Sequence, residues 1–313
     1  MLCSGHAACP GCVEALSVRH VLAAMGPNAM AVIPPSCMAI IAGPQPLSSL
    51  RIPVYQPTLE SAAAAASGLR RALDAQGQHD THVIVLAGDG GTYDIGFQCL
   101  SSAAERNENM LYFCLDNEGY MNTGAQKSSS TPHFARTGST PQGKTSCKKN
   151  LTEIMAAHRV PYVATASVGD LPDLMRKVEK AKALRGMRII TLLVPCLDGW
   201  GLPDAGGLRA ARYAVESGAF PLYEVEDGER YTLNHAQRTR PVSDYLALQR
   251  RYRHLPEASI AALQAEVDAG WERLARQVAM SPVRDADPCA AGLKPGVAAP
   301  PFAGQSAAAS SPS

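Results

Sequence analysis

Two polar residues, Asp89 and Asn117, carry the clearest chemistry in this sequence. Asp89 lies in a Gly-Asp-Gly-Gly-Thr segment at 88–92, and Asn117 follows Asp116 directly after an apolar run. A carboxylate oxygen and an amide oxygen are ligands that Mg²⁺ prefers when phosphate oxygens complete its octahedron. The glycines beside Asp89 allow the backbone to approach a diphosphate closely. The pair therefore predicts a site for a divalent metal bound to a diphosphate.

Four of the nine cysteines have positions that suit a second metal centre. Cys9 and Cys12 form a Cys-Pro-Gly-Cys motif, which is compatible with zinc, a redox dithiol or an iron-sulfur cluster. Cys37 and Cys196 each lie shortly after an apolar run. Four thiolates suit a [4Fe-4S] cluster or a structural zinc, and ligand type alone leaves both open. The other cysteines are interpreted as ordinary thiols, with Cys3 as a substitute ligand: Cys99, Cys114, Cys147 and Cys289.

The elements around these residues are expected to bring them to one sheet edge. Residues 83–86 and 111–115 are short apolar runs typical of buried parallel strands, and 188–194 is the clearest strand of all. In open α/β sheets, ligands bind beyond the carboxyl ends of the strands. Asp89 and Asn117 should therefore emerge on the same edge.

Alternating strands and helices predict an α/β fold with a mostly parallel sheet flanked by helices. Residues 208–236 are expected to be irregular, as an extended arm or a small hairpin. Segment 117–149 shows neither the helical nor the strand periodicity of apolar residues, and a loop of that length is usually functional or disordered. Helices are expected at 12–25, 58–73, 97–107, 151–158 and 171–184, with further strands at 30–33 and 162–166.

Three regions are predicted along the chain. Residues 1–240 form the α/β domain that carries both candidate sites. Residues 241–286 form a C-terminal helical extension that packs on this domain or on a partner, because apolar residues recur there at steps of three and four. Residues 287–313 are rich in Ala, Pro, Gly and Ser and are predicted to be a disordered tail.

Composition excludes several classes of function. A net charge of +1 argues against nucleic-acid binding. The sequence has neither a long apolar stretch nor a secretory signal, so we expect a cytoplasmic protein with no membrane contact. The lysines of the long loop are interpreted as a solvated face, with a coenzyme A phosphate or an acidic ferredoxin as alternative contacts: Lys127, Lys144, Lys148 and Lys149.

With these residues assembled, the sequence resembles the thiamine diphosphate-binding β subunits of 2-oxoacid:ferredoxin oxidoreductases, the family of pyruvate:ferredoxin oxidoreductase. The resemblance runs from Leu2 to the helix near Val278 and is most specific at 88–96 and 116–126. In the thiamine diphosphate fingerprint, Gly-Asp-Gly is followed by about 25 residues and then by a closing pair. Here Asp116 replaces the usual first Asn of that pair, and Asn117 occupies the second position, which is the metal ligand in that fingerprint.

The resemblance implies a role for each candidate residue. Asp89, Asn117 and the carbonyl oxygen of Gly119 would ligate Mg²⁺, and Asn122 would act as the catalytic residue that hydrogen-bonds the 2-oxo group. A [4Fe-4S] cluster beside thiamine diphosphate would be held by Cys9, Cys12, Cys37 and Cys196. The cofactor-binding residues implied are Gly88, Asp89, Gly90, Gly91, Thr92, Asn117, Gly119, Asn122, Thr123, Gly124 and Gln126.

The resemblance also implies an activity and partners. The expected reaction is oxidative decarboxylation of a 2-oxoacid to acyl-coenzyme A and CO₂, with electrons passing through the cluster to ferredoxin. Pyruvate is the substrate first expected, and branched-chain and aryl 2-oxoacids are alternatives. A separate α subunit would supply the activating Glu, without which this chain is inactive, and γ and ferredoxin-like δ subunits are further partners. The alternatives are a non-redox thiamine diphosphate decarboxylase or carboligase and a noncatalytic zinc-stapled subunit.

Overall fold

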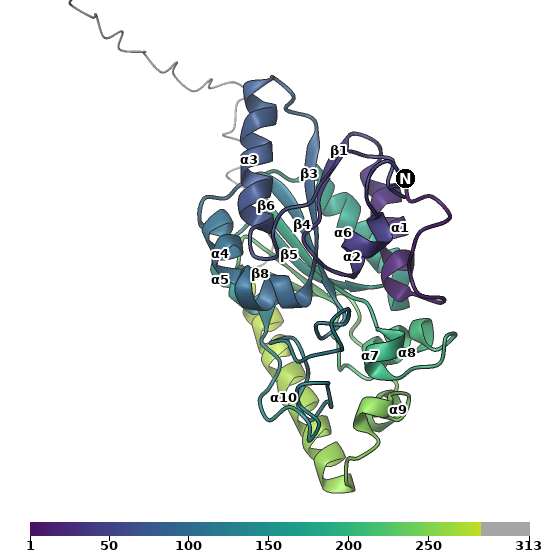
Figure 1. The fold of residues 1–313 in the computed structure, drawn as a ribbon. Helices are drawn as coiled ribbons and strands as arrows, with labels where there is room; N and C mark the ends of the chain where they lie inside the picture. The colour runs from purple at the N-terminus through teal and green to yellow at the C-terminus, as the bar shows by residue number, and fades with distance from the viewer. Residues whose placement is uncertain (283–313) are drawn as a thin grey trace, which may run out of the picture. The chain divides into compact units, whose positions relative to one another are not determined.

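An eight-stranded sheet organises residues 1–282, the part of the chain that the computed structural model describes (Figure 1). The strand order is β2-β1-β3-β4-β6-β5-β7-β8; pairing is parallel from β2 to β5 along this order and antiparallel at β7 and β8. This confirms the predicted mostly parallel sheet. The strands are β1 Ala29–Val32, β2 Val54–Tyr55, β3 His82–Gly88, β4 Met110–Asp116, β5 Tyr162–Ser167, β6 Met187–Leu193, β7 Tyr223–Glu226 and β8 Arg230–Leu233.

Every predicted helix is present, although some ends differ. The helix expected from residue 58 begins at Ala62, because Thr58 accepts a turn hydrogen bond from the backbone of Ser61 at 3.2 Å. Short helices at Cys37 and Leu197 were not predicted, since fewer than two turns leave no clear period. The helices are α1 Val13–Met25, α2 Cys37–Ala42, α3 Ala62–Ala75, α4 Phe97–Glu105, α5 Leu151–Ala157, α6 Leu171–Ala183, α7 Leu197–Trp200, α8 Gly207–Glu216, α9 Val242–Ala247 and α10 Glu257–Met280.

Alternate residues of the central strands supply two hydrophobic cores. Ile84 and Leu86 pack with α1, α2 and α6, whereas Val83 and Val85 pack with α3, α4 and α5 on the other face (Figure 1). A strand that is covered on both faces is apolar throughout. This explains why the central strands could be recognised as continuous apolar runs.

Residues 208–236 contain the small hairpin that was expected, formed by β7 and β8, and also a helix that was not. Helix α8 buries mainly small residues, Ala210, Ala211 and Ala214, together with Val215. Alanine is only weakly apolar, so the buried face of this helix has little contrast in the sequence. The description of the whole region as irregular was therefore wrong for α8.

The amphipathic helix predicted near the C-terminus is present as α10. Leu263 joins a third core beneath α7, α8 and α9, and Leu274 joins the core beneath α3 and α4. Trp271 Nε1 donates to the carbonyl oxygen of Gly218 at 2.9 Å. The helix thus packs on its own chain, while the domain boundary at 240 stays a prediction. The predicted tail at 287–313 lies outside the described residues.

The strand order brings the candidate ligands to one edge of the sheet. Cys37 follows β1, Asp89 follows β3, Asn117 follows β4 and Cys196 follows β6, and these four strands are neighbours in the order β1-β3-β4-β6. Their parallel pairing points all four carboxyl ends the same way. The segments that leave these ends therefore form one surface. Within residues 1–282, no helix has the length and apolar character needed to cross a membrane.

Candidate functional site

Three oxygen atoms converge beyond the ends of β3 and β4. The side-chain oxygen of Asn117 lies 2.8 Å from Asp89 Oδ1 and 2.8 Å from the carbonyl oxygen of Gly119. Its amide nitrogen is turned the other way, toward Cys37 Sγ at 3.8 Å. If the amide were rotated, the nitrogen would donate to both oxygens. In the orientation described, the three oxygens together offer a coordination site to a cation.

The spacing of these oxygens fits Mg²⁺. An octahedral ion with bonds of about 2.1 Å holds adjacent ligands about 3 Å apart. Asn117 can therefore occupy an octahedral position adjacent to both Asp89 and Gly119. The remaining positions would then be available to diphosphate oxygens and water. One carboxylate and two neutral oxygens also suit a hard cation better than they suit zinc.

Asp89 is a buried carboxylate that lacks a counter-charge of its own. Its Oδ2 accepts a hydrogen bond from Ser128 Oγ at 2.5 Å, and its side chain is buried. Burial, followed by repulsion from Asp116, raises the pKa of Asp89 well above the usual range. A divalent cation would reverse this effect, because a bound ion is the largest local charge in such a site. Ser128 was not predicted as a site residue.

Glu118 sets the direction of its two neighbours. Its φ angle is 67°, a left-handed backbone conformation that residues other than glycine rarely adopt. Its carboxylate contacts Lys148 Nζ at 3.0 Å and Arg251 at 2.5 Å. Burial alone would raise the pKa of Glu118, but Lys148 and Arg251 outweigh it and hold that pKa below the usual range. These cations therefore stabilise the bend between Asn117 and Gly119.

Asp116 has a specific cation partner in Lys148. Asp116 Oδ2 lies 2.7 Å from Lys148 Nζ, and Oδ1 accepts from Ser130 Oγ at 2.5 Å. The carboxylate that replaces the usual Asn is thus neutralised inside the protein. The interpretation of the loop lysines as a solvated face was wrong for Lys148 and for Lys144, which is 4% exposed. A charged residue with buried partners cannot be distinguished from a surface residue by composition.

The glycines around Asp89 have packing reasons of their own. A Cβ on Gly90 would lie 2.3 Å from the Tyr120 ring, and one on Gly91 would lie 3.1 Å from Leu59. A Cβ on Gly88 would make only an ordinary contact of 3.5 Å. Close packing therefore already favours glycine strongly at Gly90 and leaves little room for a side chain at Gly91. Their contact with a diphosphate stays a prediction.

Thr92 lies in a π-helical segment, η1 (Gly90–Ile95), that follows Asp89. Its Oγ1 donates to the carbonyl oxygen of Gly88 at 2.8 Å and lies 3.0 Å from Tyr112 Oη. Single π-helical turns are frequent at functional sites. The hydroxyl is engaged with protein atoms, so Thr92 orients this turn, and its contact with a cofactor also stays a prediction.

The predicted pocket loop is a tight turn beside the cysteines. Tyr120 and Gln126 exchange backbone hydrogen bonds of 2.9 and 3.2 Å, and Thr123 Oγ1 donates to Gln126 Oε1 at 2.5 Å. Asn122, Thr123 and Gly124 are exposed at the tip of this turn. Asn122 Oδ1 accepts from Cys37 Sγ at 3.3 Å. The turn therefore links the predicted catalytic residue to one of the predicted cluster ligands.

Three of the four candidate thiols lie at helix N-termini. Cys12 precedes α1 and accepts from the backbone of Ala15 at 3.5 Å, and Cys196 precedes α7 and accepts from Gly199 at 3.4 Å. Cys37 is the first residue of α2. Helix N-termini favour the thiolate form that binds metals. In the metal-free chain burial opposes this effect, and it raises the pKa of Cys196 to about 11.

The four thiols are close enough to influence one another, although no three of them form a tight group. Burial raises the pKa of Cys37, and Glu14, Cys196, Cys12 and Cys9 then add to this by repulsion. Within residues 1–282, no three of these thiols lie within 4.8 Å of one another. A single tetrahedral zinc would hold its sulfurs less than about 4 Å apart. A cluster of several iron atoms separates its ligands more widely than a single zinc ion does.

Glu14 is a buried carboxyl group that the sequence analysis missed. It is 5% exposed on the first turn of α1, and its Oε1 has no hydrogen-bond partner among the described residues. Burial raises the pKa of Glu14 to about 8, and a hydrogen bond from Asn117 lowers it only in part. An acidic residue in the first turn of a helix is usually a solvated charge that complements the helix dipole. Only the position of α1 against the sheet reveals that this one is buried.

The sequence of this chain is similar to those of several known enzyme subunits. Residues 38–192 match the thiamine pyrophosphate enzyme family at its C-terminal TPP-binding domain. The chain is 48% identical over 279 residues to pyruvate synthase subunit PorB of Methanothermobacter thermautotrophicus, covering 87% of this chain and 96% of that protein. It is 42% identical over 284 residues to ketoisovalerate oxidoreductase subunit VorB of Pyrococcus abyssi, covering 87% and 91%.

A solved structure has a similar fold. It is the 2-oxoglutarate:ferredoxin oxidoreductase from Magnetococcus marinus with 2-oxoglutarate, coenzyme A and succinyl-CoA bound. The TM-score is 0.53 at 22% identity, and the match covers 62% of this chain and 68% of that one. At this level of identity the likeness concerns the arrangement of strands and helices.

Proposed function

Because this chain belongs to the 2-oxoacid:ferredoxin oxidoreductase family, among the relatives of the pyruvate synthase subunit PorB, we propose that it is the β subunit that binds thiamine diphosphate, Mg²⁺ and a [4Fe-4S] cluster. The proposed reaction converts a 2-oxoacid and coenzyme A into acyl-coenzyme A and CO₂. Ferredoxin receives the electrons. Pyruvate is the substrate proposed first, and a branched-chain 2-oxoacid is the main alternative because VorB is also a relative.

One observation carries this proposal. The three-oxygen cluster at Asp89, Asn117 and Gly119 is continuous with the thiols, because the Asn117 side chain faces Asp89 on one side and Cys37 on the other. A decarboxylase without redox chemistry has no need of thiols beside its diphosphate site. The contact therefore favours an enzyme whose electrons leave close to where the carbon chemistry occurs.

The chain itself has two tasks at the thiamine diphosphate site. Thiamine diphosphate, when bound, supplies an electron sink for decarboxylation, and an iron-sulfur cluster supplies one-electron transfer. Asp89, Asn117 and Gly119 hold the metal that anchors the diphosphate. Asn122, exposed at the tip of the 120–126 turn, can donate its amide N–H to the 2-oxo oxygen as negative charge develops there. Its Oδ1 lies 3.3 Å from Cys37 Sγ, so the amide group lies directly beside the candidate cluster ligands.

The proposed active site is shared with a second subunit. Activation of thiamine diphosphate requires a carboxylate at its aminopyrimidine, and by resemblance an α subunit supplies that Glu. The exposed tip formed by Asn122, Thr123 and Gly124 is a surface that such a subunit can reach. The γ and ferredoxin-like δ subunits of the family are proposed partners as well.

Activity with and without the partner tests this proposal. The complex, co-purified under anaerobic conditions, is supplied with a 2-oxoacid, coenzyme A and a low-potential electron acceptor, and reduction of the acceptor is followed. We expect turnover from the complex, none from the isolated chain, and none from a complex carrying Asp89→Asn. Robust turnover by the isolated chain would refute the shared site. Decarboxylation without any reduction of the acceptor would favour the non-redox enzyme, and zinc in stoichiometric amount without thiamine diphosphate would favour a noncatalytic subunit.

A further inference from the structure

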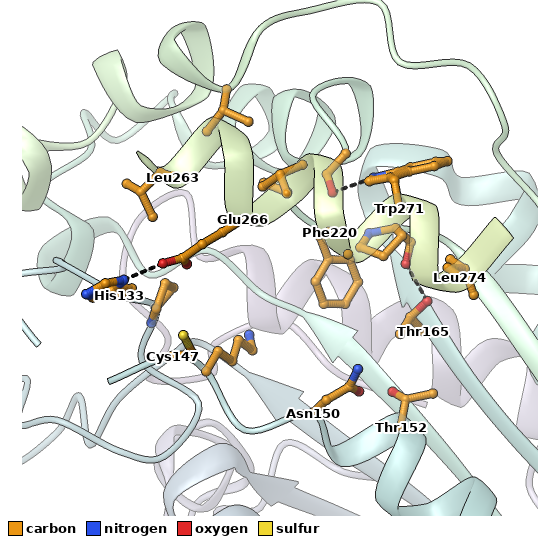
Figure 2. Close-up of a pocket in the computed structure, with 18 of the residues that line it drawn as sticks. His133, Cys147, Asn150, Thr152, Thr165, Phe220, Leu263, Glu266, Trp271 and Leu274 are labelled. Carbon is orange, nitrogen blue, oxygen red and sulfur yellow. Dashed lines mark hydrogen bonds and ion pairs between the residues drawn. The ribbon is translucent and has the colours of Figure 1, made fainter. Parts of the chain in front are cut away.

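Three potential metal ligands of different chemistry meet away from the site described above. His133 Nδ1 lies 2.5 Å from Glu266 Oε1, and Cys147 Sγ is within 4.8 Å of a ring nitrogen of His133 and of a carboxylate oxygen of Glu266 (Figure 2). His133 and Cys147 come from the long 117–149 loop, whereas Glu266 comes from α10. Residues 133 and 266 are far apart in the sequence, so the tertiary fold alone creates this cluster.

The side chains next to Cys147 leave its thiol free to join the cluster. Lys148 extends its ammonium group to Asp116 at 2.7 Å, and Lys149 donates to the carbonyl oxygen of Tyr93. Both cations adjacent in the chain are therefore turned inward and neutralised or hydrogen-bonded. The ring of His133 is also held in place, because it stacks on Phe134 with ring centroids 3.6 Å apart.

The cluster lies at the rim of a cavity of about 500 Å³ between α10 and the sheet (Figure 2). The walls are mostly apolar and include Phe220, Leu263 and Trp271. Thr191 also lines this cavity; it is 2% exposed, and its Oγ1 has no hydrogen-bond partner among the described residues. An unpaired buried hydroxyl costs stability unless water or a ligand reaches it. The cavity thus has room for a water or small ligand beside the three side chains.

We propose that His133, Cys147 and Glu266 bind a Zn²⁺ ion at the rim of this cavity. A thiolate, an imidazole and a carboxylate are all zinc ligands, and three protein ligands plus one open position is the pattern of zinc sites that exchange a ligand. Tetrahedral zinc holds such ligands about 3.3–3.6 Å apart. The His133–Glu266 pair must open by about 1 Å, and Cys147, which already lies within 4.8 Å, must close by at most about 1.5 Å. Side-chain rotation suffices for both movements.

Zinc at this position would connect two parts of the chain that serve the proposed active site. The 117–149 loop carries Asn122 and also Ser128, whose hydroxyl binds Asp89. Helix α10 carries Glu266 and packs on the cores beneath it. A bound ion would therefore tie the loop to α10 and raise the stability of the folded chain. This site is independent of the four-cysteine centre, since it shares no residue with it.

Cobalt substitution tests the proposal directly. The full chain, in its anaerobically purified complex, is titrated with Co²⁺, whose bond to a thiolate produces a charge-transfer band. The Mg²⁺ site has no thiolate, and Co²⁺ at vacant cluster cysteines would produce the same band in every variant. We therefore expect the total band in Cys147→Ser to be weaker than in the wild type by the intensity of one cobalt–thiolate bond, with one Co²⁺ fewer bound, and to be unchanged in Cys99→Ser, the matched loss of one thiol elsewhere.

Two further measurements use the other ligands. Glu266→Gln and His133→Gln are each expected to weaken zinc binding by about tenfold or more, and zinc should raise the melting temperature of the wild type but not that of Cys147→Ser. Circular dichroism verifies that each variant is folded. Equal cobalt stoichiometry and equal bands in the wild type and Cys147→Ser would overturn the proposal. The proposal would also be overturned if Glu266→Gln and His133→Gln both bound zinc with wild-type affinity. The contact between His133 and Glu266 would then be an ion pair and not part of a metal site.

Discussion

Replacing Lys148 with Met tests how the bend at the metal site is held. Lys148 Nζ lies 2.7 Å from Asp116 and 3.0 Å from Glu118, and these carboxylate side chains are 0% and 5% exposed. At an effective dielectric constant of about 20, each attraction is about 6 kcal/mol before desolvation is counted. Desolvation offsets much of this, and removal of one partner from a buried pair typically costs about 3–5 kcal/mol. Because the Lys148 side chain is 26% exposed, we expect the lower end, about 3 kcal/mol.

The assay is thermal and denaturant unfolding of Lys148→Met beside two companion variants. A loss of about 3 kcal/mol corresponds to a melting temperature lower by about 6 °C or more. Adding Asp116→Asn should restore about half of the loss or more, because an amide needs no counter-charge and Glu118 keeps Arg251 at 2.5 Å. Lys127→Met, an exposed lysine in the same loop, is the control and should change stability by less than about 0.5 kcal/mol.

Two results would refute this reasoning. If Lys148→Met remained within about 1 kcal/mol of the wild type, the pair would be no more than a surface contact. If Asp116→Asn failed to stabilise Lys148→Met, the cost would not come from an unpaired carboxylate. We also expect Lys148→Met to weaken Mg²⁺ binding, since Glu118 would lose one of the two cations that hold its left-handed conformation.

The remaining predictions concern the metal, the thiols and α10. In the complex, Asp89→Asn should lower the affinity for Mg²⁺ and thiamine diphosphate by at least about tenfold, as measured by calorimetry. The far-ultraviolet circular dichroism spectrum should stay unchanged. Wild-type affinity in this variant would contradict the assignment of Asp89 as a metal ligand. Because burial raises the pKa of Asp89, the stability of the metal-free chain should fall as pH rises above the usual range for Asp. For the same reason, Mg²⁺ binding should release a proton. Equal heats of Mg²⁺ binding in buffers of different ionisation enthalpy would contradict this release. Cys37→Ser should remove the contribution of one [4Fe-4S] cluster from the iron signal and Cys99→Ser should not; iron content equal in both would exclude Cys37 as a ligand. Trp271→Ala should cost about 3–5 kcal/mol in unfolding, because Trp271 is 9% exposed and bonded to Gly218; a loss under about 1 kcal/mol would show that α10 packs loosely.

Much of the fold could be predicted from the sequence because the central strands are buried on both faces. A run such as 83–86 is then apolar at every position, and the following Gly-Asp-Gly marks where it ends. The parallel direction of β1, β3, β4 and β6 follows from the alternation of strands and helices, whereas the strand order, with β6 rather than β5 beside β4, was not predicted. Helix α8 escaped detection because its buried face consists largely of alanine.

The candidate site could be predicted only where local motifs carry it. Asp89 and Asn117 each follow a strand, so strand positions alone bring them together. Lys148 and Arg251 could not be identified in this way, because a lysine or arginine distant in sequence acquires its role only through tertiary contact with Glu118. The same holds for Glu14, whose position on the first turn of a helix resembles that of a solvated residue. Contacts between distant segments therefore limited the sequence analysis more than the identity of the residues did.

Metal and cofactor analysis of the complex, co-purified without oxygen, tests the central claim most directly. The account predicts thiamine diphosphate and, beyond the iron of any ferredoxin-like subunit, about four iron and four sulfide ions for each copy of this chain. It also predicts that Cys37→Ser or Cys196→Ser removes the contribution of one [4Fe-4S] cluster from the electron paramagnetic resonance signal after reduction. Thiamine diphosphate with no iron, or zinc at the four cysteines in place of iron, would contradict the account.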